Sequence, residues 1–260
     1  MKTKLFIAAM AALVTSFVAA PASADMLDDI IARKTIRVAV PTDYPPFGSV
    51  GSDMQPQGMD IDMARLIAKS LGVEVELIPV TAPNRVAYLQ TGKSDLTISS
   101  LGKTEERAKV IDFSIAYSPF FDAVFGAKNP PIEKHEDLTG HTIAVTRGSM
   151  QDQELEELAP GAVVKRFEDN NSTIAAFISG QVAMFASGTP VAAAIKKRSP
   201  DLDLELKIVL ANSPCYVGVA KGETRLLEKV NSIIREAKAS GEIDRLSLQW
   251  LGAPSGDLPE

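Results

Sequence analysis

Three segments of the chain carry side chains that could hold a small polar ligand. Thr42–Phe47 contains two aromatic rings, and Ser99–Arg107 contains neighbouring hydroxyls and a guanidinium group. In Thr146–Met150, a Gly-Ser pair precedes a helical pattern. Hydroxyls, the free N–H groups of a helix N-terminus and a guanidinium fork all suit a negatively charged ligand group. The three segments therefore favour a binding site.

Each segment taken alone has a commoner interpretation. The two aromatic residues, Tyr44 and Phe47, could simply cover the core. Arg107 could be a surface charge beside its glutamates, and Ser149 could only cap a helix. Only the combination of the segments favours a ligand.

Residue patterns typical of catalysis or metal binding are missing from the sequence. His135 and His141 lie in a polar connecting region without acidic or cysteine partners at ligand spacing, so we expect no metal site and no cofactor. No G-x-S-x-G, Walker A or strand-linked G-x-G-x-x-G pattern occurs. Cys215 is the single cysteine, which excludes an intrachain disulfide. A binding protein is the better expectation than an enzyme.

Composition and the N-terminal leader narrow the class of protein. The 260 residues carry a net charge of −6, which argues against nucleic-acid binding. Lys2 and Lys4 precede a 16-residue apolar run and the segment Ala22-Ser23-Ala24, as in a secretory signal peptide. A retained membrane anchor is the less favoured alternative because the run is shorter than the ~20 residues that span a bilayer. Removal of residues 1–24 leaves 236 residues with a charge of −8, and we expect a periplasmic protein.

The elements that must position the three segments alternate between strands and helices, which predicts an α/β fold. We expect strands at 36–40 and 73–80 and an amphipathic helix from Asp60 to Leu71 that ends at Gly72. Residues 86–100 align without a gap with residues 174–188, and each copy has the pattern of a helix, a capping glycine and a buried strand. This internal echo, a weak sequence repeat, suggests two similar lobes, although the identity between the copies is slight.

Several motifs resemble those of the polar amino acid-binding family of periplasmic solute-binding proteins, which feed ABC transporters. Gly58–Met63 is similar to the family's Gly-aromatic-Asp-apolar-Asp signature, with Met59 as a departure. Ser99–Arg107 followed by Ile111–Ser114 is a stronger match. The resemblance continues through Gly126–Asn129 to Trp250–Gly252 and covers essentially the whole mature chain.

The resemblance implies a two-lobed, type II-like periplasmic-binding-protein fold with two hinge crossings. Lobe 1 would combine residues 25–119 with 215–260, and lobe 2 would be residues 120–214. The crossings would lie near Pro119-Phe120 and Ser213-Pro214, with Cys215 a small apolar residue beside the second. The ligand, a small molecule with a carboxylate, would be trapped between the lobes. The implied partner is the membrane permease of an ABC transporter, and the chain would be a monomer.

The family's binding residues can be carried over only to matching positions. Tyr44 matches the aromatic residue that stacks on the ligand, and Arg107 matches the arginine that grips its carboxylate. The remaining matches supply hydroxyl and backbone contacts: Ser99, Ser100, Gly102, Ser149 and Met150.

One position departs seriously from the family. Relatives carry an aspartate for the ligand's α-ammonium where this chain has Gly188. Asp43, Glu168 or Asp169 could replace that acid, and Arg147 is a further candidate for ligand contact. Otherwise the ligand lacks a free ammonium, and we hypothesise a modified amino acid or an amine-free carboxylate.

Two other functions remain open on the same fold. Some similar proteins are periplasmic dehydratases of cyclic acids, and Glu168 would then be the acid/base residue. The other alternative is that the protein senses a ligand and acts as the partner of a signalling receptor.

Overall fold

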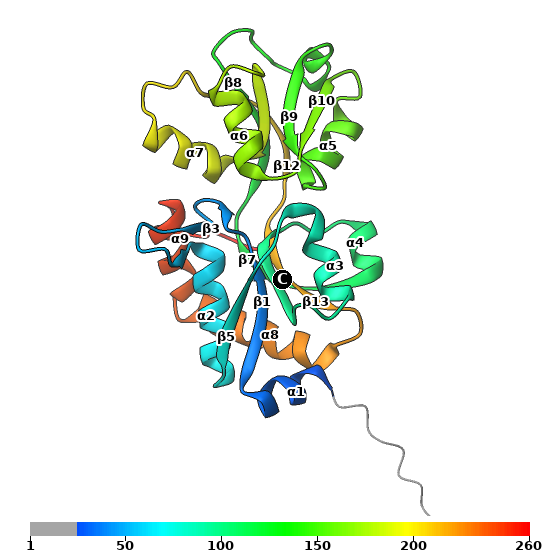
Figure 1. Cartoon of the computed structure of the whole chain (residues 1–260), viewed down its shortest axis with the longest axis vertical. Coiled ribbons are helices and arrows are strands. Elements are labelled where there is room, and N and C mark those ends of the chain that lie inside the picture. The colour runs from blue at the N-terminus through cyan, green and yellow to red at the C-terminus, as the bar shows by residue number, and fades with distance from the viewer. Residues whose placement is uncertain (1–24) are drawn as a thin grey trace, which may run out of the picture.

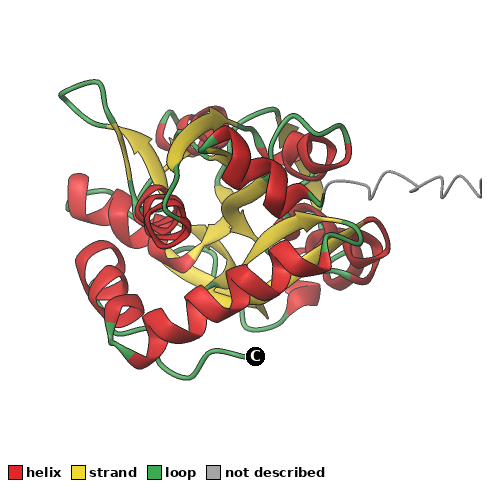
Figure 2. Ribbon diagram, turned by 90° about the horizontal axis from the view of Figure 1, so that it is seen from below, coloured by secondary structure: helices red, strands yellow, loops and turns green. Residues whose placement is uncertain are grey.

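The computed structural model describes residues 25–260, so the predicted signal peptide lies outside the described residues. These residues form two lobes, one above the other in Figure 1, and each lobe is built on a five-stranded sheet. Figure 2 shows helices on both sides of the strands. The sequence-based prediction of a two-lobed α/β fold is confirmed.

The sheet of lobe 1 has the order β5-β1-β6-β13-β7. Its strands are β1 (Thr35–Val40), β5 (Glu74–Pro79), β6 (Leu96–Leu101), β7 (Ile111–Ser118) and β13 (Cys215–Ala220). Its helices are α1 (Met26–Arg33), α2 (Met59–Leu71), α3 (Arg85–Gln90), α4 (Glu105–Val110), α8 (Thr224–Ala239) and α9 (Glu242–Leu251). A small three-stranded sheet consists of β2 (Asp43–Tyr44), β3 (Gly48–Val50) and β4 (Pro56–Gln57).

The sheet of lobe 2 has the corresponding order β10-β9-β11-β8-β12. Its strands are β8 (Phe121–Gly126), β9 (Thr142–Thr146), β10 (Val163–Phe167), β11 (Met184–Gly188) and β12 (Glu205–Asn212). Its helices are α5 (Met150–Leu158), α6 (Asn170–Ile178) and α7 (Thr189–Arg198). Short 3-10 turns lie at Ala82–Asn84 and His135–Leu138.

The internal echo corresponds to one repeated structural unit. In lobe 1, β6 pairs in parallel with β1, and Leu96 faces Val38. In lobe 2, β11 pairs in parallel with β9, and Met184 faces Ile143. Leu96 and Met184 hold the same place in the echo, four residues after a glycine with positive φ. The two copies therefore place the carboxyl ends of β6 and β11 in equivalent positions in the two lobes.

The chain passes between the two sheets twice, from β7 to β8 and from β12 to β13. The two passages are joined by a hydrogen bond of 2.9 Å from the backbone N–H of Ser213 to the carbonyl oxygen of Phe120. Cys215 is the first residue of β13 and is buried. The exact lobe boundaries at 119–120 and 214–215 stay a prediction.

Local sequence explains the element ends near the site. The apolar face of α2 is buried against lobe 1, and Gly72 takes the left-handed conformation (φ 70°) that ends the helix. Strand β6 is buried along its whole length, as expected for a central strand covered on both faces. The core thus holds the end of β6 rigidly at the border between the lobes.

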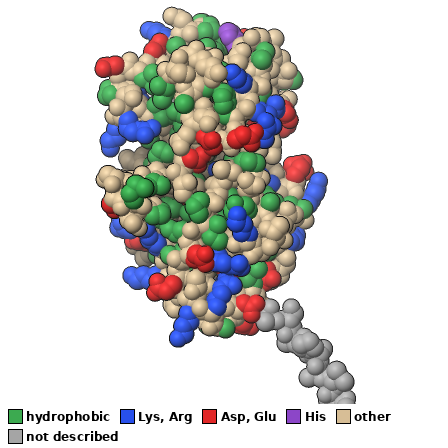
Figure 3. Space-filling view, viewed as in Figure 1, with side chains coloured by type: hydrophobic (Ala, Val, Ile, Leu, Met, Phe, Trp, Pro, Cys, Tyr) green, Lys and Arg blue, Asp and Glu red, His purple; other side chains and the backbone are tan. Residues whose placement is uncertain are grey.

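The face of the molecule shown in Figure 3 carries charges of both signs. On the face shown in Figure 3, basic and acidic side chains are interspersed over both lobes. Within residues 25–260, none of the helices has the length and apolar character needed to cross a membrane.

Candidate functional site

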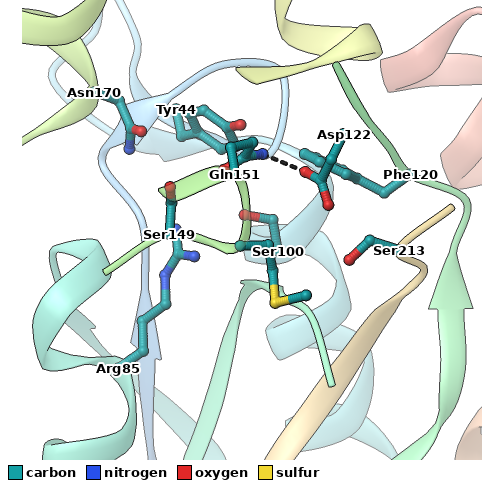
Figure 4. A pocket seen from close by; sticks show the side chains of 10 residues that line it. Tyr44, Arg85, Ser100, Phe120, Asp122, Ser149, Gln151, Asn170 and Ser213 are labelled. Carbon is teal, nitrogen blue, oxygen red and sulfur yellow. Dashed lines mark hydrogen bonds between the residues drawn. The ribbon is translucent and has the colours of Figure 1, made fainter. Parts of the chain in front are cut away.

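A pocket lies between the two lobes and is lined by ten residues. Figure 4 shows its side chains, which come from both lobes. Lobe 1 supplies Tyr44, Arg85 and Ser100, and the remaining lining residues are Phe120, Asp122, Ser149, Met150, Gln151, Asn170 and Ser213. Of the residues predicted from the sequence, the pocket brings together Tyr44, Ser100, Ser149 and Met150.

Ser100 lies at the end of β6 with a constrained backbone. Its φ of 41° is unusual for a residue with a Cβ atom. Its N–H donates to Oδ2 of Asp60 at 2.7 Å, and the hydroxyl of Tyr117 donates to Oδ1 of Asp60 at 2.5 Å. Burial raises the pKa of Asp60 to about 7, against the effect of these two hydrogen bonds. The family-like Asp60 therefore holds the Ser100 backbone at the edge of the pocket.

Arg85 is a lining residue that the sequence analysis missed. It is the first residue of α3, is only 5% exposed, and its Nε donates to Oγ of Ser99 at 3.1 Å. In Figure 4 its guanidinium group points up towards Ser149. A cation in the first turn of a helix opposes the helix dipole, and this local mismatch was the signal that could have identified it.

Arg107 connects the lobes rather than lining the pocket. Its NH1 donates to the carbonyl oxygen of Gly102 in lobe 1 at 2.8 Å, and its NH2 donates to that of Gly148 in lobe 2 at 3.0 Å. Burial and the neighbouring charge of Arg85 lower its pKa to about 10, so it stays charged at neutral pH. The binding of a ligand carboxylate by Arg107 stays a prediction.

The lobe-2 wall is built on the N-terminus of α5. Ser149 caps this helix by accepting a hydrogen bond from the N–H of Asp152 at 3.2 Å, as its local sequence predicts. The next residue, Met150, packs against Gly102, where an added Cβ atom would lie 2.6 Å from the methionine Cγ. Gly102 therefore serves the contact between the lobes by having no side chain.

Tyr44 reaches from lobe 1 to the end of β11. Its hydroxyl lies 3.1 Å from Oγ of Ser187 and accepts a hydrogen bond from the N–H of Gly188 at 3.2 Å. Its ring stacks on Phe47, with centroids 6.1 Å apart. Tyr44 thus forms both a wall of the pocket and a contact between the lobes.

The acids proposed to replace the missing aspartate are not free in the pocket. Asp43 accepts two hydrogen bonds from Asn170, from the backbone N–H at 2.8 Å and from Nδ2 at 3.1 Å. Glu168 is exposed and pairs with the equally exposed Arg147 at 2.8 Å. Asp169 caps α6 through the N–H of Ser172. The structure therefore does not bring Arg147, Glu168 or Asp169 to the pocket.

Asp122 is the acid that does line the pocket, and the sequence analysis missed it too. It lies on β8 with no exposed surface, and Nε2 of Gln151 donates to its Oδ1. Its Oδ2 has no hydrogen-bond partner among the described residues. Burial and the nearby charge of Glu154 raise its pKa well above the ordinary value. A single acid inside the apolar run Phe120–Phe125 was the available signal.

Metal-binding chemistry has no support from the part of the chain that is described. Residues 25–260 contain no group of three or more acidic, histidine or cysteine side chains that could surround an ion. The single acid that lines the pocket is better suited to one cationic group than to a metal ion.

Comparison with known proteins gives relatives along most of the chain. The L-cystine-binding protein TcyJ of Escherichia coli is 27% identical over 230 residues, which cover 88% of this chain and 86% of the relative. A mutant of the arginine-binding protein ArgBP of T. maritima is 32% identical with a TM-score of 0.81, covering 87% of this chain and 99% of that one. The ancestral amino acid-binding protein AncCDT-1, described as a precursor of cyclohexadienyl dehydratase, is 33% identical with a TM-score of 0.79, covering 88% of this chain and all of that one.

The family match spans the two lobes and the pocket between them. The model of the bacterial extracellular solute-binding proteins, family 3, matches residues 36–253. That range includes each of the residues that line the pocket. The chain therefore belongs to the bacterial extracellular solute-binding proteins of family 3.

Proposed function

We propose that the protein is a periplasmic receptor that binds a small amino acid or amino-acid-like carboxylate between its lobes and delivers it to the permease of an ABC transporter. The observation that carries this proposal is the polar pocket shared by the lobes, with Arg85 on one wall and the N-terminus of α5 on the other. A carboxylate between them would meet a guanidinium group, hydroxyls and helix N–H groups. The relatives named for cystine and arginine binding support the ligand class.

Contacts between the lobes provide the mechanism of closure. Arg107 donates to Gly148, Tyr44 contacts Ser187 and Gly188, and these bonds exist only when the lobes meet. A ligand that contacts both walls stabilises this closed arrangement and shifts the equilibrium between open and closed molecules towards it. Opening releases the ligand to the permease.

A ligand screen tests the proposal directly. Thermal unfolding is measured with each standard L-amino acid, L-cystine, and a set of small mono- and dicarboxylates, because a ligand that binds only the folded state raises the Tm. We expect at least one carboxylate to raise the Tm. The variant Arg85→Gln should lose that shift, while Arg147→Gln, an exposed arginine outside the pocket, should keep it. No shift with any carboxylate would contradict the proposal.

Export is tested separately. We infer that residues 1–24 are a cleaved signal peptide and that the mature protein acts as a monomer in the periplasm. Mass spectrometry of the exported protein should give an N-terminus at Asp25, and light scattering should give the mass of one chain.

A dehydratase is the second candidate function. Asp122 is a better candidate than Glu168 for its acid/base residue, because Asp122 lines the pocket and Glu168 is exposed. Its raised pKa would let a carboxyl in the pocket act as a general acid. We nonetheless favour a receptor that is not an enzyme, since TcyJ and ArgBP are named for binding. Turnover of prephenate by the purified protein, abolished in Asp122→Asn, would decide for the enzyme.

A further inference from the structure

We propose that Glu154 keeps a proton on the carboxyl group of Asp122, so that the pocket presents a neutral acid to its ligand and binds carboxylates more weakly when that proton is lost at alkaline pH. Glu154 acts through Asp122 and does not itself line the pocket, which makes it a positioning residue. The effect on binding rests on the proposed function, whereas the shared proton is a property of the ligand-free protein.

Two acids and one amide form a buried cluster between β8 and α5. Asp122 on β8 has no exposed surface, and Glu154 on α5 is only 9% exposed. Gln151 lies three residues before Glu154, so both side chains project from the same face of the helix. Because Nε2 of Gln151 donates to Oδ1 of Asp122, that face is turned towards β8. The helix thereby brings the carboxyl group of Glu154 within hydrogen-bond reach of Asp122.

Each acid has one oxygen for which residues 25–260 supply no donor. These two oxygens are Oδ2 of Asp122 and Oε2 of Glu154, and both are shielded from solvent. Ionised carboxylates only accept hydrogen bonds, so two of them would repel each other and leave both oxygens without a partner. One proton between the acids supplies the missing donor and removes the repulsion. The buried pair is therefore most stable with a single negative charge.

Asp122 is the acid that holds the proton. Burial, the charge of Glu154 and the hydrogen bond to Glu154 all raise the pKa of Asp122 well above its ordinary value. Burial also raises the pKa of Glu154, but the hydrogen bond from Asp122 and the charge of Arg107 act in the opposite direction. Glu154 therefore carries the charge and accepts the hydrogen bond, and Asp122 stays neutral and donates it.

The other groups that face the pair come from both lobes. The strands beside β8 place Gly188 and Ala211 opposite Asp122, and neither has an ionisable side chain. The charged and titratable groups around the pair are Glu157 on α5, Arg107 on α4, Tyr44 on β2, Cys215 on β13 and Arg85 on α3. Burial raises the pKa values of Tyr44 and Cys215, so both stay neutral, and Glu157 is exposed to solvent. The two arginines are thus the main charges that the pair meets.

Loss of the proton would add a second negative charge beside the proposed carboxylate site. With the proton in place, the pair sets one negative charge against the cations Arg85 and Arg107. A second negative charge balances both cations, and a ligand carboxylate then enters a pocket without net positive charge. Binding of a carboxylate therefore weakens as the pH rises. The pKa of Arg107 is lowered only to about 10, so a change below pH 9 reports mainly on the acids.

Difference infrared spectroscopy of the ligand-free protein detects the proton directly. The C=O stretching band of protonated carboxyl groups is recorded from pH 6 to pH 9 for the wild type and Asp122→Asn, so that the contribution of Asp60 cancels. We expect an extra band in the wild type at pH 7. In Glu154→Gln this band should be lost at a pH about one unit or more lower, because the negative neighbour is gone. Glu157→Gln, which removes an exposed acid from the same helix, should behave like the wild type.

The effect on binding is measured with the standard L-amino acids, L-cystine and succinate at pH 7 and pH 9. Thermal unfolding identifies the carboxylates that bind, and calorimetric titration gives their affinities. We expect the affinity of the wild type to fall about 10-fold or more between the two pH values. Asp122→Asn has no proton to lose at this position and should keep a nearly constant affinity, and Glu157→Gln should follow the wild type.

The outcomes separate this inference from the proposed function. The absence of the extra band, or an unchanged midpoint in Glu154→Gln, would overturn the shared proton. A band that is lost with rising pH while the affinity stays constant would overturn its effect on binding. No Tm shift with any carboxylate at either pH would refute the receptor itself, and the infrared band would still decide the protonation of the pair. If Asp122→Asn proved unfolded by circular dichroism, comparison of the wild type with Glu154→Gln would decide it.

Discussion

Asp122 and Gly188 face each other across the antiparallel strands β8 and β11 at the border between the lobes. The glycine has an ordinary extended backbone (φ −82°), so it is not required for conformational reasons. A Cβ atom there would instead come within 2.1 Å of the ring of Phe120. The ring of Phe120 therefore occupies the space that a side chain at position 188 would need. The acidic side chain in this region, Asp122, lies on the neighbouring strand β8.

Gly188→Ala should disturb this arrangement without straining the backbone. The added methyl group collides with Phe120, whose ring is buried against Phe47 with centroids 5.3 Å apart. We expect the ring to move into the pocket and ligand affinity to fall by about 10-fold or more, consistent with the cost of overpacking. Calorimetric titration with the ligand found in the screen measures the change. The double variant Gly188→Ala/Phe120→Leu should recover part of the affinity, and no recovery would argue against the steric explanation.

The sequence alone predicts the scaffold well because its signals are local. The apolar spacing of α2 and the glycine at its end, the serine that caps α5, and the repeated helix-glycine-strand unit each depend on neighbours in the chain. The structure places the predicted helix within one residue of its expected start. Tyr44 and Ser100 likewise line the pocket because each lies near the carboxyl end of a strand of that scaffold, Tyr44 four residues after β1 and Ser100 in the next-to-last position of β6.

The charged lining residues could not be predicted in the same way. The role of Asp122 depends on the insertion of β8 beside β11, two strands that are separated in the chain by about 60 residues and by β9 and β10. Arg85 depends on the approach of the N-terminus of α3 to lobe 2. The three acids predicted as replacements, Asp43, Glu168 and Asp169, instead contact Asn170, Arg147 and Ser172.

Tyr44→Phe should weaken closure of the lobes. The change removes the hydroxyl that contacts Ser187 at 3.1 Å and accepts from Gly188 at 3.2 Å. Ser187 is only 3% exposed, so its hydroxyl would lose a buried partner. We expect ligand affinity to fall by about 3- to 30-fold, the range for one or two buried hydrogen bonds. Tyr88 lies on α3 and is not among the residues that line the pocket, so Tyr88→Phe is the matched control and should bind like the wild type.

Arg107→Lys should affect binding more than its unchanged charge suggests. The arginine joins Gly102 and Gly148 through two separate nitrogen atoms, one towards each lobe, and a single ammonium group cannot copy that planar fork. We expect affinity to fall about 10- to 100-fold with little change in the Tm of the ligand-free protein. Titration and thermal unfolding measure the two quantities. Arg147→Lys, an exposed residue paired with Glu168, should leave both unchanged, and an equal loss there would point to a general charge effect.

Asp60→Asn should change how stability depends on pH. Burial raises the pKa of Asp60 from an ordinary 3.8 to about 7, so the folded protein holds a proton that the unfolded chain releases between these values. Stability conferred by that proton is present at low pH and is lost as pH rises through this window, by at most about 4 kcal/mol. Asparagine has no carboxyl group to ionise, and the Tyr117 hydroxyl can rotate to accept from its amide.

The free energy of unfolding, measured in urea from pH 4 to pH 8, should therefore fall less steeply for Asp60→Asn than for the wild type. Asp201→Asn, an exposed acid, should show the wild-type slope, and an equally steep fall in Asp60→Asn would place the responsible proton on another group, such as Asp122 or Glu154, whose pKa values are also raised by burial.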